Sequence, residues 1–70
     1  MRYAVVIETA GDNFSAYAPD LPGCIATGTT FKDAETQIRG AIEFHIAGLR
    51  EDGLPLPPAT SQVEYIEIAA

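Results

Sequence analysis

The stretch Tyr-Ala-Pro-Asp-Leu-Pro-Gly-Cys-Ile-Ala-Thr-Gly-Thr-Thr, residues 17–30, decides how this chain folds. Pro19 and Pro22 fix φ and lack an N–H, so neither fits inside the hydrogen-bond ladder of a central strand. Asp20 can accept bonds from backbone N–H groups two residues further on, and Gly23 is free to take a positive φ. We therefore expect a structural turn made of Pro19, Asp20, Leu21, Pro22, Gly23 and Cys24.

Strands are expected on both sides of this turn. Residues 3–9 alternate between two faces, with aromatic and β-branched side chains at every second position, which is typical of a strand. Residues 14–18 repeat the alternation after a connection over residues 10–13 that suits a hairpin. Beyond the turn, residues 24–29 form a third short run. Three strands joined by short turns predict an antiparallel meander.

A single long helix is expected next. Thr30 and Asp33 have the spacing of a capping box, in which a threonine begins the helix and an acid lies three residues inside it. Gly53 ends the pattern, because a glycine commonly follows the last helical residue, so the helix should run to about Asp52. Its apolar stripe would pack on one face of the sheet and consists of Phe31, Ala34, Ile38, Ala41, Ile42, His45 and Leu49.

A fourth strand is predicted at the carboxyl end. Three prolines within residues 54–58 exclude a helix and favour an extended connector. Residues 63–68 alternate again, and the preceding helix allows them to join the sheet parallel to a neighbour by a right-handed crossover. The expected fold is therefore α+β, in the order β-β-β-α-β, with residues 1–70 as a single domain.

Composition narrows the classes of function. Ten acids against four bases give a net charge of −6, which argues against direct nucleic-acid binding and favours a basic partner. The same charge can also serve solubility alone. One cysteine cannot form an internal disulfide, and no apolar run approaches the roughly 20 residues that span a bilayer. We expect a cytoplasmic protein that contacts no membrane and needs no cofactor or metal.

Candidate catalytic residues are few. The acids near the expected strand ends are Glu8 and Asp20, whereas a two-metal site needs several carboxylates that converge on two ions. His45 could act as a base or a metal ligand, but no nucleophile or second ligand is placed beside it, so a packing role is expected. Cys24 is expected to be a small buried apolar residue. A small metal-dependent nuclease or hydrolase that uses Asp20, Glu8 or His45 is the alternative function.

Two surfaces are candidates for protein contacts. Phe44 lies away from the helical stripe beside Gly40 and Gly48, so an aromatic side chain borders a patch that another backbone can approach. Ile46, on the opposite flank, widens this apolar surface. The sheet face away from the helix is the second surface, together with the closing strand. Self-association would add core to so short a chain, so we expect a homo-oligomer, a dimer or tetramer. The candidate interface residues are Phe44, Gly40, Gly48, Val63 and Tyr65.

Several short motifs carry a family resemblance that covers nearly the whole chain. They are Arg2–Glu8, Pro19–Cys24, Gly28–Thr30, Ala34 with Ala41 and Ile42, Gly48–Gly53, and Leu56–Pro58. Taken together, these motifs make the chain similar to the HicB family of type II antitoxins. The six-residue turn at residues 19–24 is a fairly specific signal in this context.

This resemblance implies a partial ribonuclease H-like fold without the catalytic carboxylate cluster, and a role that is not enzymatic. HicB-like antitoxins bind and block small, basic, RNA-cleaving toxins that resemble HicA, so a toxin of that kind is the implied partner. Many members continue into a DNA-binding domain, whereas this chain ends at Ala70, so specific operator binding by this chain alone is not expected. An orphan oligomeric scaffold without a toxin is a further alternative.

Overall fold

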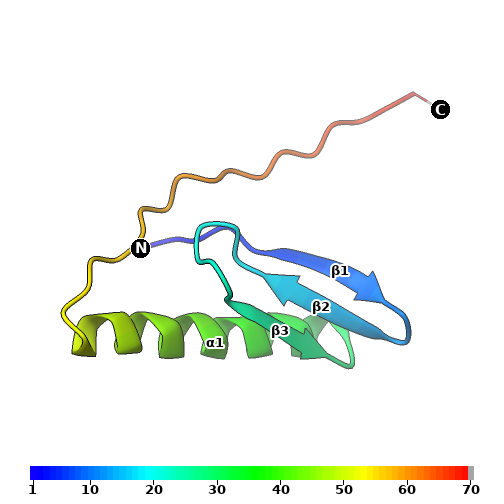
Figure 1. Cartoon of the computed structure of the whole chain (residues 1–70). Helices are drawn as coiled ribbons and strands as arrows, with labels where there is room; N and C mark the ends of the chain where they lie inside the picture. The colour runs from blue at the N-terminus through cyan, green and yellow to red at the C-terminus, as the bar shows by residue number, and fades with distance from the viewer. Residues whose placement is uncertain (70) are drawn as a thin grey trace.

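The computed structural model describes residues 1–69, which contain three strands followed by one helix (Figure 1). The sheet has the order β1-β2-β3, and both strand pairs are antiparallel. The helix lies along one face of the sheet, so the core forms between two layers (Figure 1). The expected α+β class, the meander and the long helix are therefore confirmed. The elements are β1 (Val6–Ala10), β2 (Asn13–Tyr17), β3 (Ile25–Gly28) and α1 (Phe31–Glu51).

The β1–β2 hairpin is tighter than the sequence predicts. Ala10 pairs with Asn13, so only Gly11 and Asp12 form the connection instead of four residues. Gly11 has a φ of 63°, and within residues 1–69 no residue other than glycine has a positive φ. A positive φ confined to the first central position is the pattern of a type II′ turn, whose twist matches that of the flanking strands.

The amino end of α1 is fixed by two side chains. Thr30 is the N-cap, and its Oγ1 accepts the N–H of Asp33 at 3.0 Å. The carboxylate of Asp33 reaches back and accepts the N–H of Thr29 at 2.9 Å. This is one residue earlier than the reciprocal bond of a standard capping box. The backbone N–H of Thr29, followed by the side-chain amide of Gln37, lowers the pKa of the Asp33 carboxyl.

The carboxyl end of α1 closes as the sequence predicts, with Asp52 as its C-cap. Gly53 follows with a φ of 69° and donates its N–H to the carbonyl of Arg50 at 3.1 Å. Leu54 donates to the carbonyl of Leu49 at 2.9 Å. This pair of bonds is the Schellman motif, which satisfies two carbonyls that the helix leaves unpaired.

The core is small and rich in alanine. Alternate residues of β2 face α1, and Ala16 is paired with Ile7 on one side and Ala26 on the other. Phe14 and Phe31 add an edge-to-face aromatic pair, with ring centroids 6.4 Å apart. Ile46, which the sequence placed on the opposite flank of the helix, packs against this core. The buried hydrophobic residues are Ala16, Ala18, Leu21, Cys24, Ala34 and Ile38.

The predicted fourth strand is absent from the part of the chain that the structure describes. Residues 63–68 are extended but belong to no sheet, and their side chains are exposed. The connector after α1 leads the chain back past the sheet (Figure 1), yet no backbone hydrogen bond joins this segment to the outer edge of β1. An extended segment becomes a β-strand only when a neighbouring strand pairs with it through backbone hydrogen bonds. Over residues 1–69 the order is therefore β-β-β-α.

Candidate functional site

The turn between β2 and β3 is held by three backbone bonds. The N–H of Ala18 donates to the carbonyl of Cys24 at 3.2 Å, and the N–H of Cys24 donates to that of Leu21 at 3.0 Å. Leu21 also donates to Ala18 at 3.0 Å, and its side chain is buried in the core. Gly23 has a φ of 79°, which favours glycine at this position. The backbone bonds and the buried Leu21 side chain thus hold the loop without the Asp20 carboxylate. That carboxylate can therefore bind another segment of the chain.

Asp20 binds the carboxyl-terminal segment, residues 54–69, rather than its own turn. Its Oδ2 accepts the N–H of Ser61 at 2.9 Å, and its Oδ1 accepts the hydroxyls of Ser61 at 2.7 Å and Thr60 at 3.3 Å. A second tie forms where the hydroxyl of Tyr3 donates to the carbonyl of Pro57 at 2.6 Å. These two ties hold the segment against the body of the domain up to Ser61.

The tie at Asp20 should depend on pH. The backbone N–H and the hydroxyl of Ser61 lower the pKa of the Asp20 carboxyl below its ordinary value of 3.8. A carboxyl whose pKa is lowered in the folded state contributes stability above its ordinary pKa, and that contribution is lost as the pH falls through the folded value. We expect the tie to be complete at neutral pH and to open only in acid below about pH 4. The amide resonance of Ser61, followed through an acid titration, measures this.

The matched variants for this titration are Asp20→Ala and Asp12→Ala. The first removes the acceptor, so the amide resonance of Ser61 should have the chemical shift of an unstructured residue at every pH. The second removes an exposed carboxyl in the β1–β2 hairpin and should leave the titration of Ser61 unchanged. An unaltered Ser61 resonance in Asp20→Ala would contradict the assignment.

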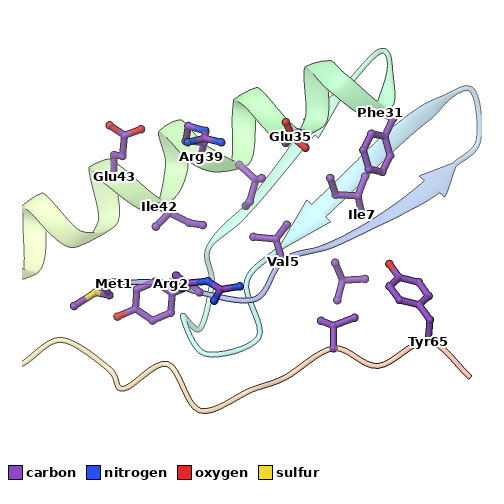
Figure 2. A pocket seen from close by; sticks show the side chains of 14 residues that line it. Met1, Arg2, Val5, Ile7, Phe31, Glu35, Arg39, Ile42, Glu43 and Tyr65 are labelled. Carbon is purple, nitrogen blue, oxygen red and sulfur yellow. The ribbon is translucent and has the colours of Figure 1, made fainter.

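An open groove lies between the start of the chain, α1 and the carboxyl-terminal segment (Figure 2). Its volume is about 940 Å³, and a smaller hollow of about 350 Å³ continues it along α1. Val5 and Ile7 line it from the strand side, and Ile38 and Ile42 line it from the helix side. The groove therefore exposes a strip of apolar surface between the two layers of the fold.

Charged side chains accompany the apolar strip. Glu35, Arg39 and Glu43 follow one another at intervals of four residues, so they share one side of α1 (Figure 2). Arg2 joins them from the start of the chain. Glu35 pairs with Lys32 at 3.0 Å, but among residues 1–69 neither Arg2 nor Arg39 forms an ion pair. Two guanidinium groups in the groove are therefore available to carboxylates of another segment.

The predicted interface residues fall on two separate surfaces. Phe44 is 83% exposed on α1 and is not among the residues that line the groove. A Cβ added at Gly40 or Gly48 would meet nothing within 4 Å, so the helix surface near Phe44 is open. Val63 and Tyr65 line the groove from the carboxyl-terminal segment instead, and Figure 2 shows Tyr65 there. The structure does not bring these five residues together.

Three residues of the groove, Val5, Ile7 and Ile42, were not among the candidates. Their alternation and helical spacing mark them as core residues, and they do pack against the core. They are also partly open, because no strand in the described part of the chain covers the outer edge of β1. The signal that could have identified the groove is the last alternating run, residues 63–68, which the sequence assigned to a strand.

The candidate catalytic side chains are not gathered into one site. Within residues 1–69, no three or more His, Cys, Asp or Glu side chains are grouped so that they could hold a metal ion. The carboxylate of Asp20 is occupied by Thr60 and Ser61, and Glu8 is exposed on β1. Burial raises the pKa of the Cys24 thiol, which keeps it protonated and a poor nucleophile. In the same residues, α1 lacks the long apolar sequence of a membrane-crossing helix.

A solved structure shares this fold. One chain of the structure described as the HicA3 and HicB3 toxin–antitoxin complex matches this chain with a TM-score of 0.72 and 35% sequence identity. The match covers 84% of this chain and 70% of the other. At this identity the likeness extends beyond the arrangement of helices and strands to the sequence that builds them.

Protein relatives agree with this comparison. A UPF0150 protein of Helicobacter pylori is 35% identical over 70 residues, which are 99% of this chain and 97% of that protein. A UPF0150 protein of Synechocystis is 38% identical over 96% of this chain and 86% of its own length. An uncharacterised 14.9 kDa protein of Haemophilus phage HP1 is 38% identical over 94% of this chain, but the chain spans only 50% of the phage protein.

Residues 3–69 match the protein family described as the HicB-like antitoxin of bacterial toxin–antitoxin systems. The match spans all three strands, the helix and the described carboxyl-terminal segment. Together with the motifs at the β2–β3 turn and the fold shared with the toxin–antitoxin complex, it assigns the family. The chain belongs to the HicB-like antitoxins.

Proposed function

We propose that this chain binds and neutralises a small, basic, RNA-cleaving toxin of the HicA kind, and that it catalyses no reaction itself. The observation that carries the proposal is the 35% identity, over 84% of this chain, to a chain of the HicA3 and HicB3 complex. That complex joins a toxin to an antitoxin, and a partner of the same class is the one we infer here.

The charge of the chain supports a basic partner. An enzyme that cleaves RNA approaches phosphates and needs clustered lysine and arginine, which a chain of net charge −6 complements. Exposed ion pairs contribute only about 0.2–1 kcal/mol each, so they speed association more than they hold the complex. Stable neutralisation therefore needs an apolar anchor as well. The exposed acids that can meet the toxin include Glu43, Glu51, Asp52, Glu64 and Glu67.

Phe44 is the anchor we assign to the toxin contact. Large aromatic side chains dominate the binding energy of many interfaces when a partner encloses them. Phe44 is 83% exposed, so nearly all of its side chain can be buried by a partner. The open positions at Gly40 and Gly48 let a partner's backbone approach the helix on either side of it. Glu43 and Glu51 are exposed on the same helix and supply negative charge nearby.

Co-expression with the gene that neighbours its own is the direct test. The chain should relieve the growth arrest caused by a toxic product of that gene and should co-purify with it at low salt. Phe44→Asp should weaken the complex about a hundredfold or more and abolish the rescue, because a charge would have to be buried where the ring sits.

Ile25→Asp is the matched control for Phe44→Asp. Ile25 is 72% exposed but lies on β3, so the same change of chemistry falls on a different surface. Both variants should unfold at similar temperatures, and Ile25→Asp should keep the rescue. If the Phe44→Asp variant neutralises the toxin no less effectively than the parent chain, Phe44 is not the anchor of the toxin contact. If the parent chain neither rescues growth nor co-purifies, the proposed function is wrong.

A further inference from the structure

The end of the carboxyl-terminal segment, residues 62–69, is an extended chain whose apolar side chains are not covered. Successive side chains of an extended chain point to opposite sides, so Val63 and Tyr65 share one side while Ile66 and Ile68 point away from them. Val63 and Tyr65 line the groove, yet Tyr65 is 91% exposed. Ile66 and Ile68 are each 74% exposed. The segment therefore has apolar residues on both sides and is buried on neither.

The outer edge of β1 is unpaired. β1 bonds only to β2, so the N–H and C=O groups on its other side face the groove without a ladder. Such an edge is a template for a further strand, and the apolar strip of Val5, Ile7 and Ile42 lies next to it. The segment of the same chain passes this edge without a backbone hydrogen bond to it.

The charges of the groove and the segment are complementary. The segment carries Glu64 and Glu67 and no base. The groove contains Arg2 and Arg39, two of the four bases of the chain, and among residues 1–69 both lack an ion pair. A strand laid along the β1 edge would bring these carboxylates close to the two guanidinium groups.

The shape of the chain favours another copy as the source of that strand. Its radius of gyration is 13.7 Å, whereas a compact chain of 70 residues has one of about 11 Å. The excess comes from the segment, which extends past the sheet and gives the molecule a long axis of 49 Å (Figure 1). Because the ties to Asp20 end at Ser61, the chain beyond this point is held only at its start.

We propose that two copies of this chain exchange residues 62–69, so that the segment of each copy pairs with the β1 edge of the other and covers its groove. A two-fold axis makes the exchange reciprocal, and it supplies in the dimer the fourth strand that a single chain lacks. This assembly does not require a toxin, so it can fail or succeed independently of the proposed function.

The first test is the mass of the purified chain in solution, measured by light scattering after gel filtration. We expect the mass of two chains. Replacing Ile66 and Ile68 together with Asp should raise the dissociation constant about a hundredfold or more and give the mass of one chain. Both side chains are exposed in the single chain, so its own fold should survive the change. Ile25→Asp, on the exposed face of β3, is the control and should remain a dimer.

The second test identifies which chain supplies the strand. One variant carries Glu35→Cys in the groove and another carries Tyr65→Cys in the segment, both in a Cys24→Ala background. Mixed and treated with a short bismaleimide, they should give a cross-linked pair that contains one chain of each kind. A chain with both cysteines that cross-links only within itself would overturn the exchange. A monomeric parent chain, or an unchanged dimer after the Ile66 and Ile68 substitutions, would overturn it as well.

Discussion

Gly28→Ala should remove about a third or more of the protein's free energy of unfolding. A Cβ at this position would lie 2.6 Å from Ala34 Cα and 2.8 Å from the carbonyl carbon of Asp33, and closer still to the Ala34 nitrogen. These are backbone atoms of α1, so only a separation of the helix from β3 can relieve the clash. Overpacking of this kind costs about 3 kcal/mol or more. A domain of 70 residues has roughly 4–10 kcal/mol of stability in total.

Gly40→Ala is the matched control for this prediction, since it adds the same methyl group to the same chain. A Cβ at Gly40 meets nothing within 4 Å, and the residue lies in the interior of α1. Alanine favours a helix by about 0.5–1 kcal/mol over glycine, so the variant should be more stable than the parent. Urea unfolding followed by circular dichroism compares the three proteins. Equal stabilities of Gly28→Ala and the parent would show that β3 and α1 are not in backbone contact.

Leu21→Ala should have the next largest effect. Leu21 is 1% exposed and is one of the two largest fully buried side chains, together with Ile38. Its removal leaves a cavity in a small core that is rich in short alanine side chains, so we expect a loss of about 2–5 kcal/mol. The turn that carries it would lose its anchor in the core, and Asp20 would lose its fixed position opposite Ser61.

The comparison for Leu21→Ala is Ile25→Ala, measured at the same protein concentration. Ile25 is 72% exposed four residues further along the chain, so its truncation should change the stability by less than about 0.5 kcal/mol. Unfolding monitored by circular dichroism separates the two cases. A small effect at Leu21 would mean that the core closes around the missing side chain.

The sequence predicts most of this fold because the decisive signals are local. The N-cap at Thr30 and the stop at Gly53 each depend on residues within a turn of the chain, and both ends of α1 follow from them. The meander follows from alternation and from a turn whose prolines cannot extend a strand. Ile38 also occupies a position of the helical stripe that the spacing predicts to be buried. The sequence does not decide which face of the sheet α1 covers, because both sets of alternating residues include apolar side chains.

What the sequence could not supply depends on partners that are distant along the chain. The carboxylate of Asp20 is typical of a turn residue, and its bond to Ser61 spans 41 positions that no local pattern encodes. Alternation at residues 63–68 predicts a strand, but it does not name the edge that would pair with it, and within residues 1–69 no strand forms there. Phe44 is conspicuous as an exposed aromatic, and the sequence offers no sign of what will cover it.

The ties from Tyr3 and Asp20 reach residues that follow α1 along the chain, so during synthesis these ties form after the body of the domain. The body of the domain is built from elements that follow one another along the chain, so it can fold as soon as α1 has left the ribosome. Residues 54–69 follow α1 along the chain and emerge about one to three seconds after it at ordinary rates of elongation. Under the proposed exchange, the groove of a nascent chain is open until then to residues 62–69 of another copy, so assembly between copies would begin on the polysome.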